Sequence, residues 1–327
     1  MRPITRRPLL AALLATPAIA RAQPAWPHRP VRVVVPFPPG GSNDVVARPL
    51  AERLQARLGQ PFVVENRGGA GGAIGAGQVA QAPADGYTLM VTSSSFATTA
   101  ILQKPGWDAE ASFDAVALLA RAPFFIMVNP TFPARSVAEL VALAKARPGG
   151  IDYASSGAGG INHFISEYFC QRAGIRMNHV PYRGTAPAVT DLVAGTIPVM
   201  ITTVASANAA IRDGRVRVIA ATAPMSGSGG GGLPPEVPPV PLVTEAGIDY
   251  EAAIWWGLLA PHGLPAGTRG AIHAAVGGAL GDAALARVYA AEGATPSPVG
   301  PEAFPAILKA DLARWREVAR IADIRAE

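Results

Sequence analysis

The stretch VRVVVPFPPGGSNDVVARPL, residues 31–50, contains the pattern that decides the fold. A short β-branched run ends in prolines and glycines, and apolar residues then recur at helical spacing. This order predicts a strand, a turn and a helix, the repeating unit of α/β proteins. The first N–H groups of a helix are unpaired and its dipole is positive there, so the glycine-rich turn predicts an anion site. We expect Ser42, Asn43 or Asp44 to cap the helix.

A second stretch, ASSGAGGINHF at residues 154–164, has the same build. Either loop taken alone can be an ordinary turn before a well-capped helix. Together, one in each predicted lobe, they predict a clamp in which two helix N-termini face one anionic ligand. His163 falls in the first turn of the second helix, where it either stabilises the loop or donates to the ligand.

Strand and helix patterns alternate through the rest of the chain and predict an α/β fold with largely parallel pairing. The predicted strands include 61–66, 87–95, 113–130 and 250–261. A helix over 136–149 is expected to have Ser136 as its N-cap and Glu139 completing a capping box. Two helical segments are expected to close the chain. Trp255 and Trp256 are adjacent in a strand, so alternation predicts one in the core and the other toward a cleft.

The first 22 residues have the pattern of an export signal. Four arginines without an acid flank the apolar run PLLAALLATPAIA, and the small-residue site ARA follows. This run is shorter than the roughly 20 residues that span a bilayer. Without those arginines the net charge falls from +5 to +1, and no Lys/Arg cluster remains to follow a nucleic-acid backbone. TRRPLL also resembles a twin-arginine signal, so export by either route is compatible.

The sequence offers little for catalysis, metals or cofactors. No lysine follows a glycine as in a P-loop, G-x-S-x-G is absent, and the five histidines form no H-x-x-x-H pair. GAGQVA, residues 75–80, lies inside a helical pattern and does not fit a dinucleotide turn. The single cysteine, Cys170, can form no intramolecular disulfide and is expected to be buried. Residues 226–241, SGSGGGGLPPEVPPVP, predict a flexible surface loop or connector.

From about Trp26 to its end, the chain resembles the Bug family, also called TctC-like: periplasmic substrate-binding proteins of tripartite tricarboxylate transporters. The resemblance rests on the two loops above and on VVENRGGAGGAIGAGQVAQAPADGYTLM, HVPYRGTAPAVTDLVAG and PLVTEAGIDYEAAIWWGLLAP. It implies a two-lobed Venus-flytrap fold, type II-like, with a mainly parallel sheet in each lobe. We expect a signal peptide at 1–22, a first lobe at 23–124 plus 252–327, and a second lobe at 125–251.

The resemblance also implies a periplasmic monomer that binds a small organic carboxylate and passes it to a membrane permease. The ligand would be a di- or tricarboxylate or an aromatic acid, held by backbone N–H groups, small polar side chains and ordered waters, with no cofactor and no nucleic acid. The candidate ligand-binding residues are Phe37, Pro38, Pro39, Gly40, Gly41, Ser42, Asn43, Asp44, Ser94, Ser155, Ser156, Gly157, Ala158, Gly159, Gly160, Ile161, Asn162, His163, Thr202 and Thr203.

Three positions depart from the family pattern. Asn43 stands where a threonine is usual, and Gly160 stands where a serine is frequent. Thr202 and Thr203 follow IPVMI, where many relatives have an acid or its amide; without that acid, a cationic amino group on the ligand is disfavoured. The residues that would contact the ligand's distal end cannot be transferred. A binding protein that signals to a receptor remains an alternative, and an enzyme in the cleft is disfavoured by the missing catalytic groups.

Overall fold

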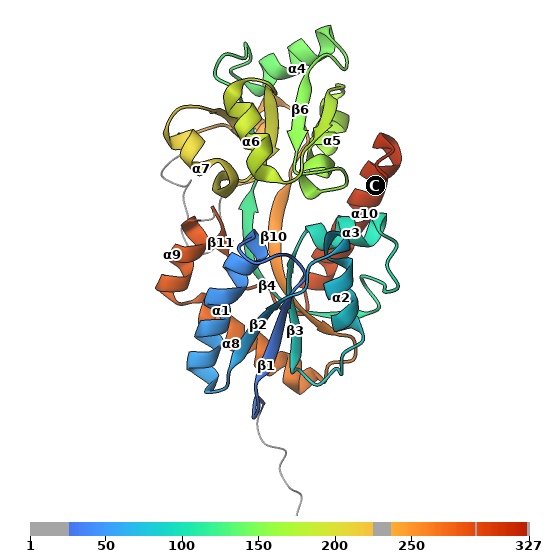
Figure 1. Cartoon of the computed structure of the whole chain (residues 1–327), viewed down its shortest axis with the longest axis vertical. Coiled ribbons are helices and arrows are strands. Elements are labelled where there is room, and N and C mark those ends of the chain that lie inside the picture. Colours follow the sequence, from blue (N-terminus) through green and yellow to red (C-terminus); the bar gives the residue numbers. More distant parts are fainter. Residues whose placement is uncertain (1–25, 225–236, 292, 326–327) are drawn as a thin grey trace, which may run out of the picture.

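The computed structural model describes residues 26–224, 237–291 and 293–325. The predicted signal peptide lies outside the described residues, as do positions 226–236 of the predicted connector. The described chain forms two lobes, each built on its own β-sheet with helices around it (Figure 1). Among the described residues, no helix combines the length and the apolar character needed to cross a membrane.

The first sheet has the strand order β11-β4-β10-β3-β1-β2. Its strands are β1 (Val31–Val35), β2 (Phe62–Asn66), β3 (Thr88–Ser93), β4 (Phe113–Pro123), β10 (Ala253–Pro261) and β11 (Thr295–Pro296). One face carries the helices α1 (Ser42–Leu58), α8 (Ala266–Leu280) and α9 (Ala283–Ala291). The other carries η1 (Ala70–Gly72), α2 (Ala73–Ala80), α3 (Ser95–Leu102) and α10 (Phe304–Ala322) (Figure 1). Helices on both faces bury this sheet from both sides.

The second sheet has the strand order β7-β6-β8-β5-β9. Its strands are β5 (Phe125–Val128), β6 (Asp152–Ser155), β7 (Asn178–Pro181), β8 (Val199–Thr202) and β9 (Arg217–Ala221). The helices of this lobe are α4 (Val137–Ala146), α5 (Ile161–Ala173), α6 (Thr185–Ala194) and α7 (Val204–Arg212), with the short η2 (Val243–Ala246). The two-lobed α/β fold predicted from the sequence is confirmed.

The pairing of the strands corrects the prediction of a mainly parallel sheet in each lobe, because parallel and antiparallel pairs are mixed in both sheets. Strands β1, β2, β3 and β4 run one way, whereas β10 and β11 run against them. In the second sheet, β6, β7, β8 and β9 share a direction and β5 opposes them. Both sheets are therefore mixed in pairing. The reversals at β10 and β5 have one cause, because each enters its sheet from the other lobe and so runs away from the boundary.

The chain crosses between the lobes as β4 continues into β5 and returns as β9 leads to β10. These crossings are joined by Thr222, whose Oγ1 accepts from the Phe124 N–H at 2.8 Å and lies 2.6 Å from the Ala252 carbonyl oxygen. Thr222 is 1% exposed. A hydroxyl that bonds both crossings fixes their separation where the lobes join.

Local patterns explain the ends of several helices and correct two predictions. Gly59 ends α1 with φ 69°, a left-handed conformation that glycine adopts without strain. Ser136 caps α4 as predicted, since its side chain accepts from the Glu139 N–H. The reciprocal half of the box is absent, because the Glu139 carboxylate accepts from the N–H of Arg135, one residue earlier. In the described part of the chain, three helices, not two, follow β10.

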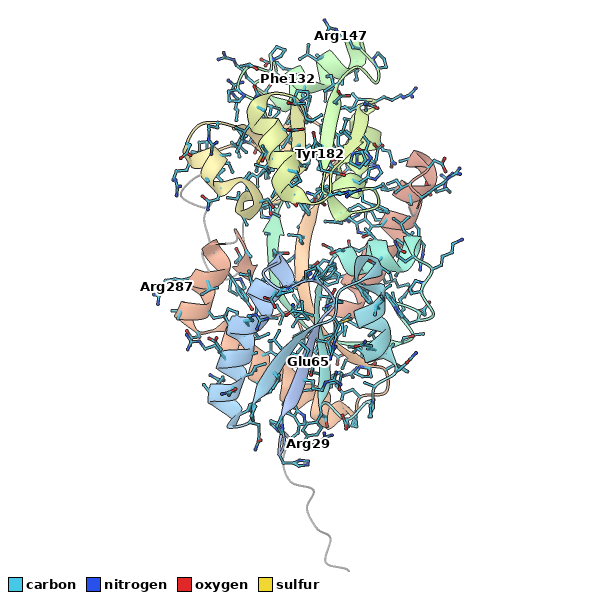
Figure 2. The ribbon with its side chains drawn as sticks, in the orientation of Figure 1. Arg29, Glu65, Phe132, Arg147, Tyr182 and Arg287 are labelled. Atoms are coloured by element: carbon cyan, nitrogen blue, oxygen red, sulfur yellow. The ribbon has the colours of Figure 1, made fainter. Side chains whose placement is uncertain are left out.

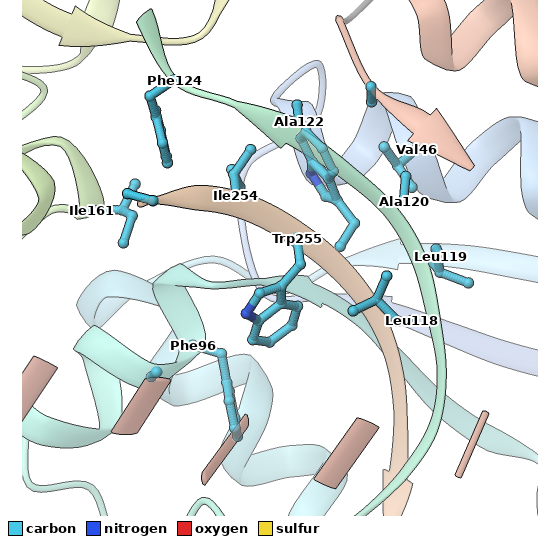
Figure 3. Packing of buried hydrophobic residues seen from close by; sticks show 14 of the residues in the cluster. Val46, Phe96, Leu118, Leu119, Ala120, Ala122, Phe124, Ile161, Ile254 and Trp255 are labelled. Atoms are coloured by element: carbon cyan, nitrogen blue, oxygen red, sulfur yellow. The ribbon is translucent and has the colours of Figure 1, made fainter. Parts of the chain in front are cut away.

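The prediction that one tryptophan of β10 lies toward the cleft is wrong. Trp255 and Trp256 are each 1% exposed, because helices cover both faces of the first sheet. The indole N–H of Trp255 donates to Asp311 Oδ2 at 2.7 Å, and Figure 3 shows this ring on the side of β10 that faces Phe96. The free Cys170 is buried, as predicted.

Candidate functional site

The parallel strands of both sheets end at the boundary between the lobes. A cavity of about 350 Å³ lies there, with walls from both lobes. Its lining residues are Phe37, Gly71, Ser95, Thr98, Thr99, Leu102, Gln103, Ser156, Gly157, Ala158, Gly159, Gly160 and Ile161. Loops after the carboxyl ends of parallel strands are the usual ligand site in α/β folds. A different cavity, about 260 Å³ and near β11, is bordered by neither glycine-rich loop.

The first glycine-rich loop, residues 37–44, presents the N-terminus of α1 without a side-chain cap. The N-cap residue is Gly41, and its carbonyl oxygen accepts from the N–H groups of Asp44 and Val45. The N–H groups of Gly41, Ser42 and Asn43 have no acceptor within the described part of the chain. The prediction that Ser42, Asn43 or Asp44 caps the helix is therefore wrong. Those N–H groups remain free to bind an anion.

Asp44 holds this loop instead of capping its helix. Its carboxylate accepts from the Gly40 N–H at 2.9 Å, from Arg48 Nε at 2.8 Å and from Asn66 Nδ2 at 2.9 Å. Asn66 Nδ2 also donates to the carbonyl oxygen of Phe37, at 3.1 Å. Burial alone would raise the pKa of Asp44, but these hydrogen bonds outweigh burial and lower it below its usual value. Its charge is thus neutralised within the loop.

The sequence reasoning did not single out Arg48 or Asn66 for this network. Asp44 and Arg48 are four residues apart on α1, a spacing that places the two side chains together. That signal was available in the sequence. The sequence carried no such signal for Asn66, the third residue of the network. Asn66 ends β2 and reaches Asp44 only because β2 pairs with β1.

The second glycine-rich loop, residues 155–161, is held by polar side chains at both of its ends. The N–H of Gly157 donates to Ser155 Oγ at 3.1 Å, and that of Gly159 donates to His163 Nδ1 at 3.2 Å. Asn162 accepts from Ser156 Oγ through Oδ1 and donates from Nδ2 to a carbonyl of β8. These side chains shape the loop by bonding to it and to the sheet.

The hydrogen bonds of this second loop leave several backbone donors unused. The N–H groups of Ala158, Ile161 and Asn162 have no acceptor among residues that the structure describes. Gly160 is the N-cap of α5, again without a side-chain cap. Tyr182, labelled in the second lobe in Figure 2, adds a backbone bond from its N–H to the Ser155 carbonyl oxygen at 3.1 Å. Both helix N-termini thus present bare N–H groups.

His163 has a defined role at this loop. It is 9% exposed, and its ring stacks on that of His179 with centroids 3.6 Å apart. Burial, with a smaller contribution from the neighbouring imidazole, lowers the pKa of His163 to about 3. Burial lowers the pKa of His179 to about 4. At neutral pH His163 is uncharged, and its Nδ1 accepts a hydrogen bond from the Gly159 N–H. Of the two roles predicted for His163, this contact supports stabilisation of the loop.

Several predicted site residues lie near the lobe boundary without lining the 350 Å³ cavity. They are Pro38, Pro39, Gly40, Gly41, Ser42, Asn43, Asp44, Ser94, Ser155, Asn162, His163, Thr202 and Thr203. Asn43 Oδ1 and Ser94 Oγ are buried and have no hydrogen-bond partner among the described residues. Such atoms normally bind ordered water or a ligand. Thr202 is buried at the end of β8, and Thr203 Oγ1 pairs with Ser206 Oγ at 3.1 Å.

The sequence reasoning missed the wall of the cavity that α3 provides. Thr98, Thr99, Leu102 and the following Gln103 line it opposite the second loop. Thr99 Oγ1 donates to the Gly71 carbonyl oxygen at 2.7 Å, which ties this helix to η1. The only sequence signal was a strand that ends in serines, and it does not say which face of the next helix reaches the cavity.

The lining of this cavity contains no ionisable side chain. An anion bound there would meet backbone N–H groups, hydroxyls and the amide of Gln103. Helix N-termini provide fixed positive potential without a counter-charge, and they bind carboxylates in this way. The geometry therefore suits a small anion better than a cation.

Two lobes, two chain crossings and a cavity walled by both lobes define a two-lobed solute-binding fold. The family described as the tripartite tricarboxylate transporter family receptor (TctC) matches residues 46–323, and the chain belongs to this family. The resemblance seen in the sequence is confirmed. Members of the family are periplasmic solute-binding proteins.

Individual relatives cover nearly the whole chain. Protein BugT of Bordetella pertussis (strain Tohama I) is 34% identical over 318 residues, with 95% of each chain covered. The structure of R. palustris Rpa4515 with adipate has 33% identity and a TM-score of 0.77, covering 92% of this chain and 99% of that one. MatC from Rhodopseudomonas palustris, with bound malate, has 30% identity and a TM-score of 0.73, covering 89% and 99%.

Proposed function

We propose that this protein captures a small organic carboxylate between its two lobes, outside the cytoplasm, and has no catalytic activity of its own. One observation carries the proposal: a cavity without ionisable side chains is lined by the start of α5, where the N–H groups of Ala158 and Ile161 are unpaired among the described residues. The first loop, which leads into the uncapped start of α1, contributes Phe37 to the same lining. Backbone donors of this kind recognise carboxylates through fixed dipoles. Adipate in one relative and malate in another support the same ligand class.

We further propose that the bound carboxylate is delivered to a tripartite tricarboxylate-type membrane permease. Membership of the receptor family of these transporters supports this step. The proposal includes a monomer exported by a signal peptide at 1–22, with lobes at 23–124 plus 252–327 and at 125–251. Sequencing the N-terminus of the exported protein tests the export step: a start near Gln23 is expected, and a retained Met1 would contradict it.

A thermal-shift screen with calorimetric titration tests the ligand class. The panel contains mono-, di- and tricarboxylates and aromatic acids, including adipate and malate. Ligand at a hundredfold excess over Kd stabilises the native state by about 2.7 kcal/mol, which is worth about 2 °C per kcal/mol in a large chain. Adipamide, the uncharged diamide of adipate, is the matched control. Binding of the acids but not of the amide supports the proposal, whereas shifts only with neutral sugars or cationic peptides would overturn it.

A further inference from the structure

Two histidines from different elements form a stack beside the second glycine-rich loop. His163 belongs to the first turn of α5 and His179 to β7, and their rings are tilted by only 16° at a centroid distance of 3.6 Å. Tyr153 on β6 continues the stack at 5.1 Å from His179. Each imidazole also makes a polar contact to the loop or its anchor: His163 to the Gly159 N–H and His179 to Ser155 Oγ.

The tautomer of His179 is linked to the acceptor that the Ser155 hydroxyl proton chooses. Ser155 Oγ lies 3.0 Å from the Gly157 carbonyl oxygen, 3.1 Å from the Gly157 N–H nitrogen and 2.6 Å from His179 Nε2. A hydroxyl has one proton to donate. When that proton is donated to the Gly157 carbonyl, Nε2 must carry the proton of the neutral imidazole and donate to Oγ. Both histidines then fix one glycine each, His163 directly and His179 through Ser155.

We propose that His163 and His179 act as an uncharged pair of positioning residues, which holds the second loop so that its unpaired N–H groups stay at the cavity wall. This inference rests on the proposed function, because the loop it positions is the one proposed to bind the carboxylate. The two attachment points, at Gly157 and Gly159, flank Ala158, whose N–H is among the free donors. The stacked rings place these two attachment points side by side.

The surroundings of the pair keep it uncharged. Tyr153 faces it from β6 and donates to Glu167 at 2.5 Å, while Glu167 and Cys170 lie further along α5. Burial raises the pKa of both Glu167 and Cys170. Strand β8 and helix α3 pack near α5 without an ionisable side chain. On α10, Asp311 and Arg314 pair with each other, and Arg314 lies over Tyr168. Among the described residues, only burial and, for His163, the neighbouring ring shift the pKa values of the two imidazoles, and no carboxylate raises either one.

An uncharged positioning pair and a charged ligand donor predict different pH profiles. With pKa values of about 3 and about 4, both imidazoles stay neutral from pH 8 to pH 5.5. Affinity for adipate should then be constant over that range, since adipate itself remains ionised through most of it. A histidine that bound the carboxylate as a cation would increase the affinity as the pH falls through about 6.5.

Two variants of His163 separate its acceptor atom from its volume. His163→Asn keeps an acceptor at the δ position, and His163→Leu replaces the ring by an apolar side chain without one. Loss of one hydrogen bond should weaken adipate binding by about two- to tenfold in His163→Leu at pH 7. His163→Asn should bind within about twofold of the wild type. Thermal unfolding of both variants checks that they are folded.

The amide NMR signals of Gly157 and Gly159 give a readout that needs no ligand. In His163→Leu both amide protons should exchange faster with solvent, and in His163→Asn their exchange rates should stay close to those of the wild type. Unchanged glycine exchange rates in folded His163→Leu would overturn the inference, as would an affinity that rises on acidification to pH 5.5. If no carboxylate binds the wild type, the proposed function is wrong. The glycine signals then still test whether His163 and His179 hold the loop.

Discussion

Single residues hold the first loop, and Asp44 is the most important of them. Its buried carboxylate satisfies a backbone N–H of the loop, a guanidinium and an amide at once. Removing this buried acceptor breaks three hydrogen bonds at once. Gly40 and Arg48 are exposed and can bind water instead, so the main loss is of the bonds that hold the loop in place. The residue type was recognisable in the sequence as part of the loop, but its partners differ from the helix N–H groups expected there.

Asp44→Ala should lower the free energy of unfolding by about 1–3 kcal/mol at pH 7 and weaken carboxylate binding. Urea denaturation and calorimetric titration measure the two effects. Because the pKa of Asp44 is lowered by folding, its contribution is present above the unfolded value near 3.8 and is lost as the pH falls through the folded value. Glu52→Ala, on the exposed face of the same helix, should change stability by less than about 0.5 kcal/mol. Equal effects of both substitutions would contradict the role of Asp44.

Gly159→Ala should weaken carboxylate binding by about 1–3 kcal/mol, as overpacking does. Gly159 has φ +70°, and a Cβ placed on it would lie 2.3 Å from Leu102 Cδ1 on α3. Leu102 must therefore move, or the lobes must separate. Adding Leu102→Ala should recover part of the loss in calorimetric titration.

Gly149 offers a matched control for this backbone conformation. It has φ +75° with no atom within 4 Å of an added Cβ. Gly149→Ala should therefore cost only the left-handed backbone strain, about 1–2 kcal/mol of stability, and leave binding unchanged. Identical affinities of the wild type and Gly159→Ala would exclude the second loop from the site.

At the scale of the elements, several described helices, among them α6, α7, α8 and α10, start without a side-chain cap, and α4 is an exception. The helix α4 lies away from the cavity and has a serine cap with a bonded side chain. Helices α1 and α5 start at the two glycine-rich loops, have glycine as N-cap and lack any side-chain cap. A capped helix gains stability, whereas an uncapped one keeps its N–H groups available for an anion. What distinguishes α1 and α5 is that their uncapped starts follow the two glycine-rich loops, which both contribute to the lining of the cavity.

Ser136→Ala should lower the free energy of unfolding by about 0.5–2 kcal/mol without changing ligand affinity. The lost bond is the one from the Glu139 N–H to Ser136 Oγ. Urea denaturation measures the change. Ser136→Thr keeps a hydroxyl cap and should therefore be nearly as stable as the wild type. If Ser136→Ala is as stable as the wild type, the cap contributes nothing to stability.

For the whole molecule, the junction of the two chain crossings sets how the lobes meet. Helix α10 adds to that junction, because it packs on α3 in the first lobe and on α5 in the second. Trp315 of α10 meets Phe164 and Tyr168 of α5 edge-on at 6.0 Å. Relative motion of the lobes must therefore be accommodated at these aromatic contacts and at Thr222.

Thr222→Val should destabilise the protein by about 1–3 kcal/mol, because the isosteric substitution leaves the Phe124 N–H and the Ala252 carbonyl without this partner. Differential scanning calorimetry and adipate titration check the effect on stability and on binding. Thr222→Ser retains the hydroxyl and should remain closer to the wild type. Equal melting temperatures for the valine variant and the wild type would show that the hydroxyl does not hold the crossings together.

The sequence by itself determined the two glycine-rich helix starts, the buried strands before them and the α/β class, because these depend on residues that are close together along the chain. It also indicated the family. Only the tertiary structure decided which side chains meet: Asn66 with Asp44, His179 with His163, and α3 with the second loop. It likewise decided that both tryptophans of β10 are buried. The physical reason is that burial and hydrogen-bond partners depend on the packing of elements that are far apart in sequence.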